Sequence, residues 1–299
     1  MSRLILVPLD GSGFAETALP AALTMAKAWD AEIEAVTVHE PIPTLEHHLW
    51  DEASRQWTEG YLKDVVTRVE QATGAHLASA TLNGAVADSL QHHAQERLAD
   101  LVVMASHGRG PLTRVWLGSV ADTFVRHATT PVLIVRPEEG RTPDLSEVAC
   151  FNHVLIPLDG SEESRVVLES ALDLGRACEC RYTLLRVYRF GEEFAAAYLP
   201  HTVQLNAQVL AEGRDKALAD IEAQAEELTA RGFQAESRLV VDSSPAAGIL
   251  SAAEELDVDL IAMATHGRAG IARMLLGSVT DKVLRGAHTP ILVCRPLGA

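Results

Sequence analysis

The most constraining feature of this chain is an internal repeat. The sequence MASHGR begins at Met104 and a Gly-Ser pair follows at Gly118, while the sequence MATHGR begins at Met263 and the same pair follows at Gly277 with the same spacing. Each copy comes after an apolar run typical of a strand and before a helical pattern. Backbone amides gathered at such a connection can hold an anion. The chain is therefore predicted to contain two similar units, each with an anion-binding site.

Length and composition agree with two globular domains. At 299 residues the chain can bury two separate cores, and its 47% apolar and 22% charged residues are typical of soluble proteins. No apolar run approaches the roughly 20 residues that span a bilayer. A polar stretch with Pro137, Gly140 and Pro143 separates the two copies. We therefore predict a first domain over residues 1–137, a linker over 138–151 and a second domain over 152–299.

Strand and helix patterns alternate in both halves, which predicts an α/β fold with two tandem, open, parallel five-stranded sheets and helices on both faces. Pro20 is expected to kink or delay the first helix, which Ser12 can cap. Strands are predicted at 4–9, 32–38, 76–82, 101–105 and 131–135, and at 154–158, 182–187, 234–241, 260–264 and 291–294. Helices are predicted at 14–29, 53–73, 86–98 and 118–128, and at 164–178, 205–230, 246–256 and 277–287.

The alignment of the two copies locates their difference in length. Asp10 aligns with Asp159, whereas Gly118 aligns with Gly277 at an offset ten residues larger, and Gly84 aligns with Ser243 at that larger offset. The ten additional residues are therefore expected between the second and third strands of the second copy, in a peripheral loop and helix.

Two segments of each copy follow strands and are expected to converge. The first is Pro8-Leu9-Asp10-Gly11-Ser12, repeated from Pro157. The second is the repeated motif at 104–119 and 263–278, called the glycine-rich segment below. In an open parallel sheet, ligands bind beyond the carboxyl ends of the strands where the strand order reverses. A glycine at a helix start lets phosphate oxygens approach the backbone, and the free amides and helix dipole favour negative charge there. Arg109 and Arg268 can clamp terminal phosphates.

These residues, in this order, resemble the nucleotide-binding type of universal stress protein, whose pattern is G-x-x-G-x(9)-G-[ST] after the fourth strand. The resemblance covers nearly the whole chain as two tandem family domains of the adenine nucleotide alpha hydrolase-like fold. It implies an ATP, ADP or AMP cofactor, with Mg²⁺ possible beside the nucleotide. Asp10, Val38, Asp159 and Val187 would hold the adenosine, and the motif glycines and serines would hold the phosphates. The candidate nucleotide-binding residues are Pro8, Asp10, Val38, Met104, Ala105, Gly108, Arg109, Gly118, Ser119, Pro157, Asp159, Val187, Met263, Ala264, Gly267, Arg268, Gly277 and Ser278.

Both copies depart from the family pattern at one position. Ala105 and Ala264 stand where the pattern has its first glycine. If that position requires a positive φ, alanine would cost stability or displace the loop. The second copy also has Ser243-Ser244-Pro245 where the first has Gly84-Ala85-Val86, so the two pockets need not be equivalent.

Several residues also have a purely structural interpretation. Asp10 and Asp159 precede glycine, and Asp-Gly is a strong turn signal. Arg109 and Arg114, with their second-copy counterparts, can be exposed loop charges. His107 and His266 lie in the repeat without a matching nucleophile motif, so local packing is the preferred interpretation and no catalytic residue is assigned. The adjacent histidines at 47–48 and 92–93 point to different helix faces, which argues against a metal site.

The leading functional hypothesis is a cytoplasmic tandem-domain stress protein that binds an adenine nucleotide as a regulatory or sensing module. A slow ATPase or adenylyl-transfer enzyme is the second hypothesis, and an interaction module whose loop Ala105 and Ala264 have closed is the third. The net charge of −16 argues against nucleic acid as a partner, and no membrane partner is expected. The last strands of the two domains, near Val135 and Cys294, are expected to pair in an intrachain pseudo-dimer, and a further homodimer is possible.

Overall fold

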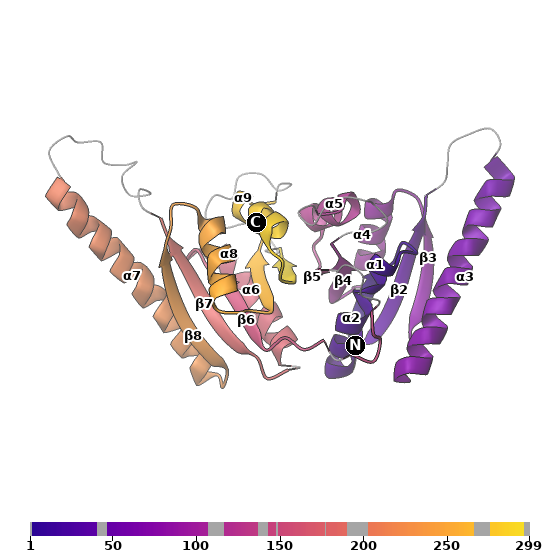
Figure 1. Ribbon diagram of the computed structural model, residues 1–299, viewed down its shortest axis with the longest axis horizontal. Helices are drawn as coiled ribbons and strands as arrows, with labels where there is room; N and C mark the ends of the chain where they lie inside the picture. The colour runs from indigo at the N-terminus through magenta and orange to yellow at the C-terminus, as the bar shows by residue number, and fades with distance from the viewer. Residues whose placement is uncertain are drawn as a thin grey trace. The chain divides into compact units, whose positions relative to one another are not determined.

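The chain divides into two compact units, Met1–Cys150 and Phe151–Ala299. The computed structural model describes residues 2–40, 47–106, 117–136, 143–147, 149–176, 178–189, 203–265 and 276–295, without the side chains of 47–52 and 203–210. Each unit is described by itself below, with the labels of Figure 1.

The first unit contains a five-stranded sheet in the order β3-β2-β1-β4-β5. Every neighbouring pair is parallel. The order reverses between β1 and β4, because the chain first builds outward from β1 through β2 to β3 and then returns to the other side. The strands are β1 (Leu4–Pro8), β2 (Glu32–His39), β3 (Ala78–Asn83), β4 (Leu101–Ala105) and β5 (Val132–Val135).

The helices of the first unit connect these parallel strands. They are α1 (Gly13–Glu16), α2 (Leu19–Trp29), α3 (His47–Thr73), α4 (Val86–Glu96) and α5 (Ser119–His127). The expected interruption near Pro20 is confirmed, since the predicted first helix is divided into α1 and α2, and proline occupies the first turn of α2. A proline there removes no hydrogen bond, because the first amides of a helix have no intrahelical acceptor.

The second unit repeats this plan with the sheet order β8-β7-β6-β9-β10, again with parallel neighbours. Figure 1 shows the long helices α3 and α7 running beside the strands of their own units. The strands are β6 (His153–Pro157), β7 (Arg181–Tyr188), β8 (Gln234–Val241), β9 (Leu260–Ala264) and β10 (Ile291–Cys294). The helices are α6 (Glu162–Gly175), α7 (Val203–Ala230), α8 (Pro245–Glu255) and α9 (Ser278–Gly286).

The central strands form the core of each unit. β1 and β4, and likewise β6 and β9, are buried along almost their whole length, as expected for parallel strands covered on both faces. Ile5, Leu133 and Leu155 are fully buried. Each buried aliphatic side chain of this size contributes about 1.5–3 kcal/mol. The sheet is therefore a rigid support for the loops at its carboxyl edge.

The difference in length between the units lies mainly before α7. The helices α3 and α7 contain 27 and 28 residues, so most of the additional residues fall between β7 and α7, in a segment that includes residues outside the described ranges. One additional residue lies elsewhere, which corrects the alignment of Gly84 with Ser243. The Gly84 amide donates to the His39 carbonyl, and the Asp242 amide donates to Tyr188 in the same way. Asp242 is therefore the counterpart of Gly84.

Among the residues that the structure describes, no helix combines the length and the apolar character needed to cross a membrane. The four cysteines are free thiols.

Candidate functional site

The predicted site residues that the structure describes lie at the carboxyl edge of each sheet, on or after three neighbouring strands. In the first unit, Asp10 follows β1, Val38 lies near the end of β2, and Ala105 ends β4. Because β2, β1 and β4 are adjacent and parallel, their ends meet at one edge, next to the point where the strand order reverses. The corresponding strands β7, β6 and β9 bring Val187, Asp159 and Ala264 together in the second unit.

The turn after the first strand has the same hydrogen bonds in both units. The Asp10 carboxylate accepts from the Ser12 amide at 2.9 Å and from its hydroxyl at 2.6 Å, and Gly11 between them has φ +81°. Ser12 in turn caps α1 by accepting from the Ala15 amide at 3.2 Å, which confirms its predicted role. The structural interpretation of Asp10 as a turn residue is thus realised, and the turn holds its half-buried carboxylate in a fixed direction.

The matching turn of the second unit is built from Asp159, Gly160 and Ser161. Ser161 donates to Asp159 through both its amide and its hydroxyl, and Gly160 has φ +80°. A side chain at either glycine would be strained in this left-handed conformation. The repeated turn therefore depends on the Asp-Gly-Ser sequence in both copies.

In both units a backbone hydrogen bond joins the start of the short helix to the residue that follows the fourth strand. The Gly118 amide donates to the Ser106 carbonyl at 2.7 Å, and the Gly277 amide donates to the Thr265 carbonyl at 2.7 Å. These glycines are the N-caps of α5 and α9, and glycine has no side chain with which to cap a helix. Ser119 and Ser278 follow at exposed positions. The other amides of the first turn have no acceptor within the helix, as at any helix start.

The first turn of each of these helices also carries an acid. Asp122 accepts from Arg126 at 2.8 and 3.0 Å, and Asp281 accepts from Arg285 at 3.1 and 3.2 Å. An aspartate in a first turn competes with a bound anion for the positive end of the helix dipole. The arginine one turn later offsets that charge in both units.

The alanines that replace the first motif glycine are accommodated without backbone strain. Ala105 and Ala264 are the last residues of β4 and β9, where they pair with Val135 and Cys294. Neither has a positive φ. The conditional expectation of a strained or displaced loop therefore does not apply at these positions, because an alanine fits a strand without difficulty.

Several other candidate residues are apolar and at least half-buried. Met104 and Met263 are buried in the strands that lead to the glycine-rich segments. Val187 lies beneath α8, where a side chain on Gly248 would approach it to 3.0 Å. Pro8 and Pro157 are half-buried at the ends of β1 and β6. Gly108, Arg109, Gly267 and Arg268, together with His107, His266, Arg114 and Arg273, lie outside the described residues.

Sequence reasoning missed a hydroxyl that ties the helix to the strand in the second unit. Thr280 is buried in the first turn of α9, and its hydroxyl donates to the Ala264 carbonyl at 2.9 Å. The matching residue of the first unit is Ala121, which has no hydroxyl. Only the second unit therefore has this particular bond across the base of the glycine-rich segment.

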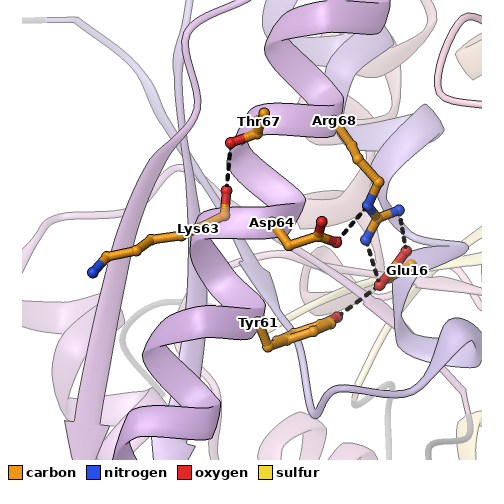
Figure 2. Close-up of polar contacts among 6 residues, drawn as sticks. All are labelled: Glu16, Tyr61, Lys63, Asp64, Thr67 and Arg68. Carbon is orange, nitrogen blue, oxygen red and sulfur yellow. Dashed lines mark hydrogen bonds and ion pairs between the residues drawn. The ribbon is translucent and has the colours of Figure 1, made fainter.

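A charged network, also missed, lies behind the turn that carries Asp10. Figure 2 shows the Glu16 carboxylate accepting hydrogen bonds from Arg68 and Tyr61 of α3. Both Arg68 terminal nitrogens donate to Glu16 at 2.9 Å, Tyr61 donates at 3.0 Å, and Arg68 also donates to Asp64 at 2.8 Å. Glu16 is buried. The network joins α1, which Ser12 caps, to the long helix α3.

The electrostatics of this network follow from burial and charge. Burial, with the carboxylates of Glu16 and Asp10 nearby, raises the pKa of Tyr61 above its ordinary value. The hydrogen bond to Glu16 raises the pKa of Arg68 in spite of partial burial. Tyr61 therefore stays a neutral donor and Arg68 stays a cation across the working range of pH.

The second unit has different residues behind its turn. Arg165 stands at the position of Glu16, and it is exposed and pairs with Glu162 at 3.3 Å. Arg186 of β7 stands at the position of Thr37 and donates to the Leu158 carbonyl at 3.3 Å. A cation thus contacts the residue that precedes Asp159.

A family model described as the universal stress protein family matches residues 1–136 and again residues 151–295. The chain belongs to the universal stress protein family. Its fold is the adenine nucleotide alpha hydrolase-like fold expected from the motif, present once in each half. The two matches show that this universal stress protein is a tandem two-domain member.

Similar proteins agree with this assignment. The chain is 32% identical over 206 residues to universal stress protein Rv2005c of Mycobacterium tuberculosis, which covers 66% of this chain and 62% of the relative. It is 28% identical to universal stress protein Rv2623 of the same organism, over 97% of this chain and 96% of the relative. The crystal structure of a universal stress protein from Archaeoglobus fulgidus has a TM-score of 0.74 at 21% identity and covers 99% of both chains, which shows the fold.

Proposed function

We propose that this universal stress protein binds ATP, or ADP or AMP, in one or both domains and acts as a regulatory or sensing module in the cytoplasmic stress response. The observation that carries the proposal is the repeated, glycine-capped helix start at Gly118 and Gly277, pinned to the adjacent strand beside the Asp10 and Asp159 turns. A helix start with uncapped amides suits an anion, and the aspartate turn lies at the position proposed for adenosine.

The residues present fit an adenine nucleotide at several points. The Gly118 amide is used by Ser106, so the phosphate donors we propose are the following amides of the first turn and the exposed Ser119 hydroxyl. The same reasoning applies to Gly277 and Ser278. Val38 and Val187 would contact the adenosine, while Gly108, Arg109, Gly267 and Arg268 complete the proposed phosphate contacts. Mg²⁺ would accompany the nucleotide.

Alanine at positions 105 and 264 does not argue against this function, since both residues adopt ordinary strand conformations. The hypothesis that these alanines close the loop loses its physical basis in backbone strain. The pairing of the last strands of the two domains, and a homodimer, stay predictions.

Calorimetric titration of the whole chain with ATP, with and without Mg²⁺, tests the proposal. Gly118 has φ −56° and ψ 149°, a conformation open to valine, so Gly118→Val adds bulk without backbone strain. We expect Gly118→Val to weaken binding in the first domain at least about tenfold, or about 1.4 kcal/mol. Gly277→Val should weaken binding in the second domain by a similar factor, so each variant reports on one of the two proposed binding sites.

A matched control is available in the same chain. Gly60 of α3 is exposed, and an added side chain would meet no atom within 4 Å, so Gly60→Ala should leave the titration unchanged. No heat from the wild-type chain with ATP, ADP or AMP would overturn the proposal. Phosphate or pyrophosphate release in the same samples tests the enzymatic alternative.

A further inference from the structure

A chain of hydrogen-bonded polar groups, two buried and one exposed, lies in the second domain at the opposite end of its strands from the proposed nucleotide site. The ring of His153, at the start of β6, is buried. Its Nε2 atom lies 2.8 Å from the Thr183 hydroxyl on β7, and that hydroxyl lies 2.9 Å from the Glu236 carboxylate on β8. On the other side of the ring, Nδ1 lies 3.2 Å from the Leu256 carbonyl after α8.

The number of protons available decides whether these contacts can all be hydrogen bonds. Three contacts require three protons, one on Nδ1, one between Nε2 and Oγ1, and one between Oγ1 and the carboxylate. A neutral histidine supplies one proton, the Thr183 hydroxyl supplies one, and an ionised Glu236 supplies none. One contact is therefore left without a proton unless the chain takes up another.

We propose that His153, Thr183 and Glu236 form a proton-binding site of the second domain that takes up one proton as the pH falls below neutrality. With that proton, Nδ1 donates to the Leu256 carbonyl, Nε2 donates to the Thr183 hydroxyl, and the hydroxyl donates to Glu236. This arrangement satisfies all three contacts.

The surroundings set the pH at which the proton is taken up. Burial lowers the pKa of His153, and the nearby charge of Arg181 lowers it further. The Leu256 carbonyl and the charges of Glu236 and Asp259 raise it. Burial and Arg181 prevail, so His153 is neutral at pH 7 and binds its second proton below the ordinary histidine pKa of about 6.5.

Glu236 connects this buried site to solvent. Thr183 is fully buried, whereas Glu236 is exposed on β8. A proton that arrives at the carboxylate can pass to the ring by a change in the direction of two hydrogen bonds, without movement of the backbone. The site therefore has both a place for the proton and a route to it.

The first domain has no equivalent chain at the matching positions. They hold Leu4, Glu34 and Ala78, because Ala78 pairs with Glu34 as Glu236 pairs with Thr183. There Glu34 is held by His93 of α4 at 2.9 Å, with Arg97 at 3.7 Å. That direct contact needs a single N–H, which a neutral histidine already supplies. Proton uptake by this mechanism thus belongs to the second domain.

Long-range proton–nitrogen NMR of the whole, ¹⁵N-labelled chain tests the proposal, because the two ring nitrogens report the tautomer and the charge. His153→Gln identifies the signals, and the exposed His288 serves as an internal reference. On acidification we expect His153 to change from a neutral ring to a doubly protonated one. Glu236→Gln and Thr183→Val should each lower the pH midpoint of His153 protonation by roughly half to one pH unit.

Thr183→Ser keeps the hydroxyl, so His153 should be protonated at the same pH midpoint as in the wild type. This variant separates the loss of the hydrogen bonds from an effect of packing. The double variant Thr183→Val with Glu236→Gln should shift the midpoint no further than the larger single variant, because both changes break one chain. The proposal is overturned if His153 titrates at the same pH in all these variants, or if its ring stays in one unchanged state until the protein unfolds. This test is independent of nucleotide binding.

Discussion

In the first domain the turn that carries Asp10 is backed by a buried carboxylate, Glu16, which α3 holds through Arg68 and Tyr61. In the second domain the matching turn is backed by Arg186 instead, and the base of the glycine-rich segment is tied by Thr280. The same backbone is thus stabilised at different points around the same site. Two copies of a fold can keep one site geometry while differing in which element supports it.

This difference has a functional meaning under the proposed nucleotide binding. Support from α3 connects the first turn to a long surface helix, whereas support from Arg186 and Thr280 keeps the second site attached to its own sheet. We therefore expect the two domains to respond differently to changes in these residues. Two matched experiments test that expectation, and a third concerns the pH dependence of the second domain.

The largest effect is expected for Glu16→Gln. The change leaves the Arg68 guanidinium without its principal carboxylate and weakens three hydrogen bonds at a buried position. Breaking a buried pair costs about 3–5 kcal/mol. Because Arg68 is 39% exposed, we discount this to a loss of about 2 kcal/mol in the free energy of unfolding of the first domain.

Hydrogen exchange resolved by domain measures this effect, because it reports opening of each domain in the whole chain. The control is Arg165→Gln at the matching position of the second domain, where the side chain is exposed and the expected change is within about 0.5 kcal/mol. Equal losses in the two variants would contradict the assigned difference in support.

A smaller effect is expected for Thr280→Ala, which gives the second domain the residue that the first has at Ala121. The change removes one buried hydrogen bond to the Ala264 carbonyl, worth about 1 kcal/mol. Amide exchange at the start of α9 should become faster, with little change at the start of α5. If exchange at the two helix starts was already equal in the wild type, Thr280 would not account for a difference between the two sites.

The smallest effect is expected in the pH dependence of stability. Burial and Arg181 lower the pKa of His153, and the neighbouring carbonyl and carboxylates partly offset this by raising it. Burial places the pKa of His153 below its value in the unfolded chain, so the unfolded chain binds the proton more readily. The contribution of this group to stability is complete above about pH 6.5 and falls as the pH drops through that value toward the folded pKa.

His153→Leu, which introduces the residue found at Leu4, should remove this component. Urea unfolding between pH 7.5 and 5.5 should show a smaller loss of second-domain stability in the variant than in the wild type. An equal loss in both proteins would show that other groups account for the pH dependence.

Much of the fold could be predicted from the sequence because it depends on local patterns. The limits of β4, β8, β9 and β10 agree with the predicted ranges, since each is an apolar or β-rich run bounded by turn residues. The division of the first helix near Pro20 follows from the missing backbone donor of proline. The Asp-Gly-Ser turns and the glycine N-caps likewise follow from short sequences.

Polar residues at apolar positions were the signals that the sequence analysis left unused. Glu16 precedes Leu19 by three residues within the helix predicted at 14–29, and His153 aligns with Leu4 of the first copy. A charged or polar group at such a position has to find partners when it is buried. The sequence marks these groups, but it does not indicate that Arg68 and Thr183 are the partners.

The sequence by itself determined the two tandem domains and their parallel five-stranded sheets, and it predicted a candidate site at the carboxyl edge of each sheet, because periodicity and turn chemistry act over a few residues. The tertiary structure alone decided that Ala105 and Ala264 lie in strands without a positive φ, that the Gly118 amide is already used, and that each domain supports its turn differently. Those outcomes depend on contacts between residues such as Glu16 and Arg68, which are distant in the chain and adjacent only after the sheet and helices have packed.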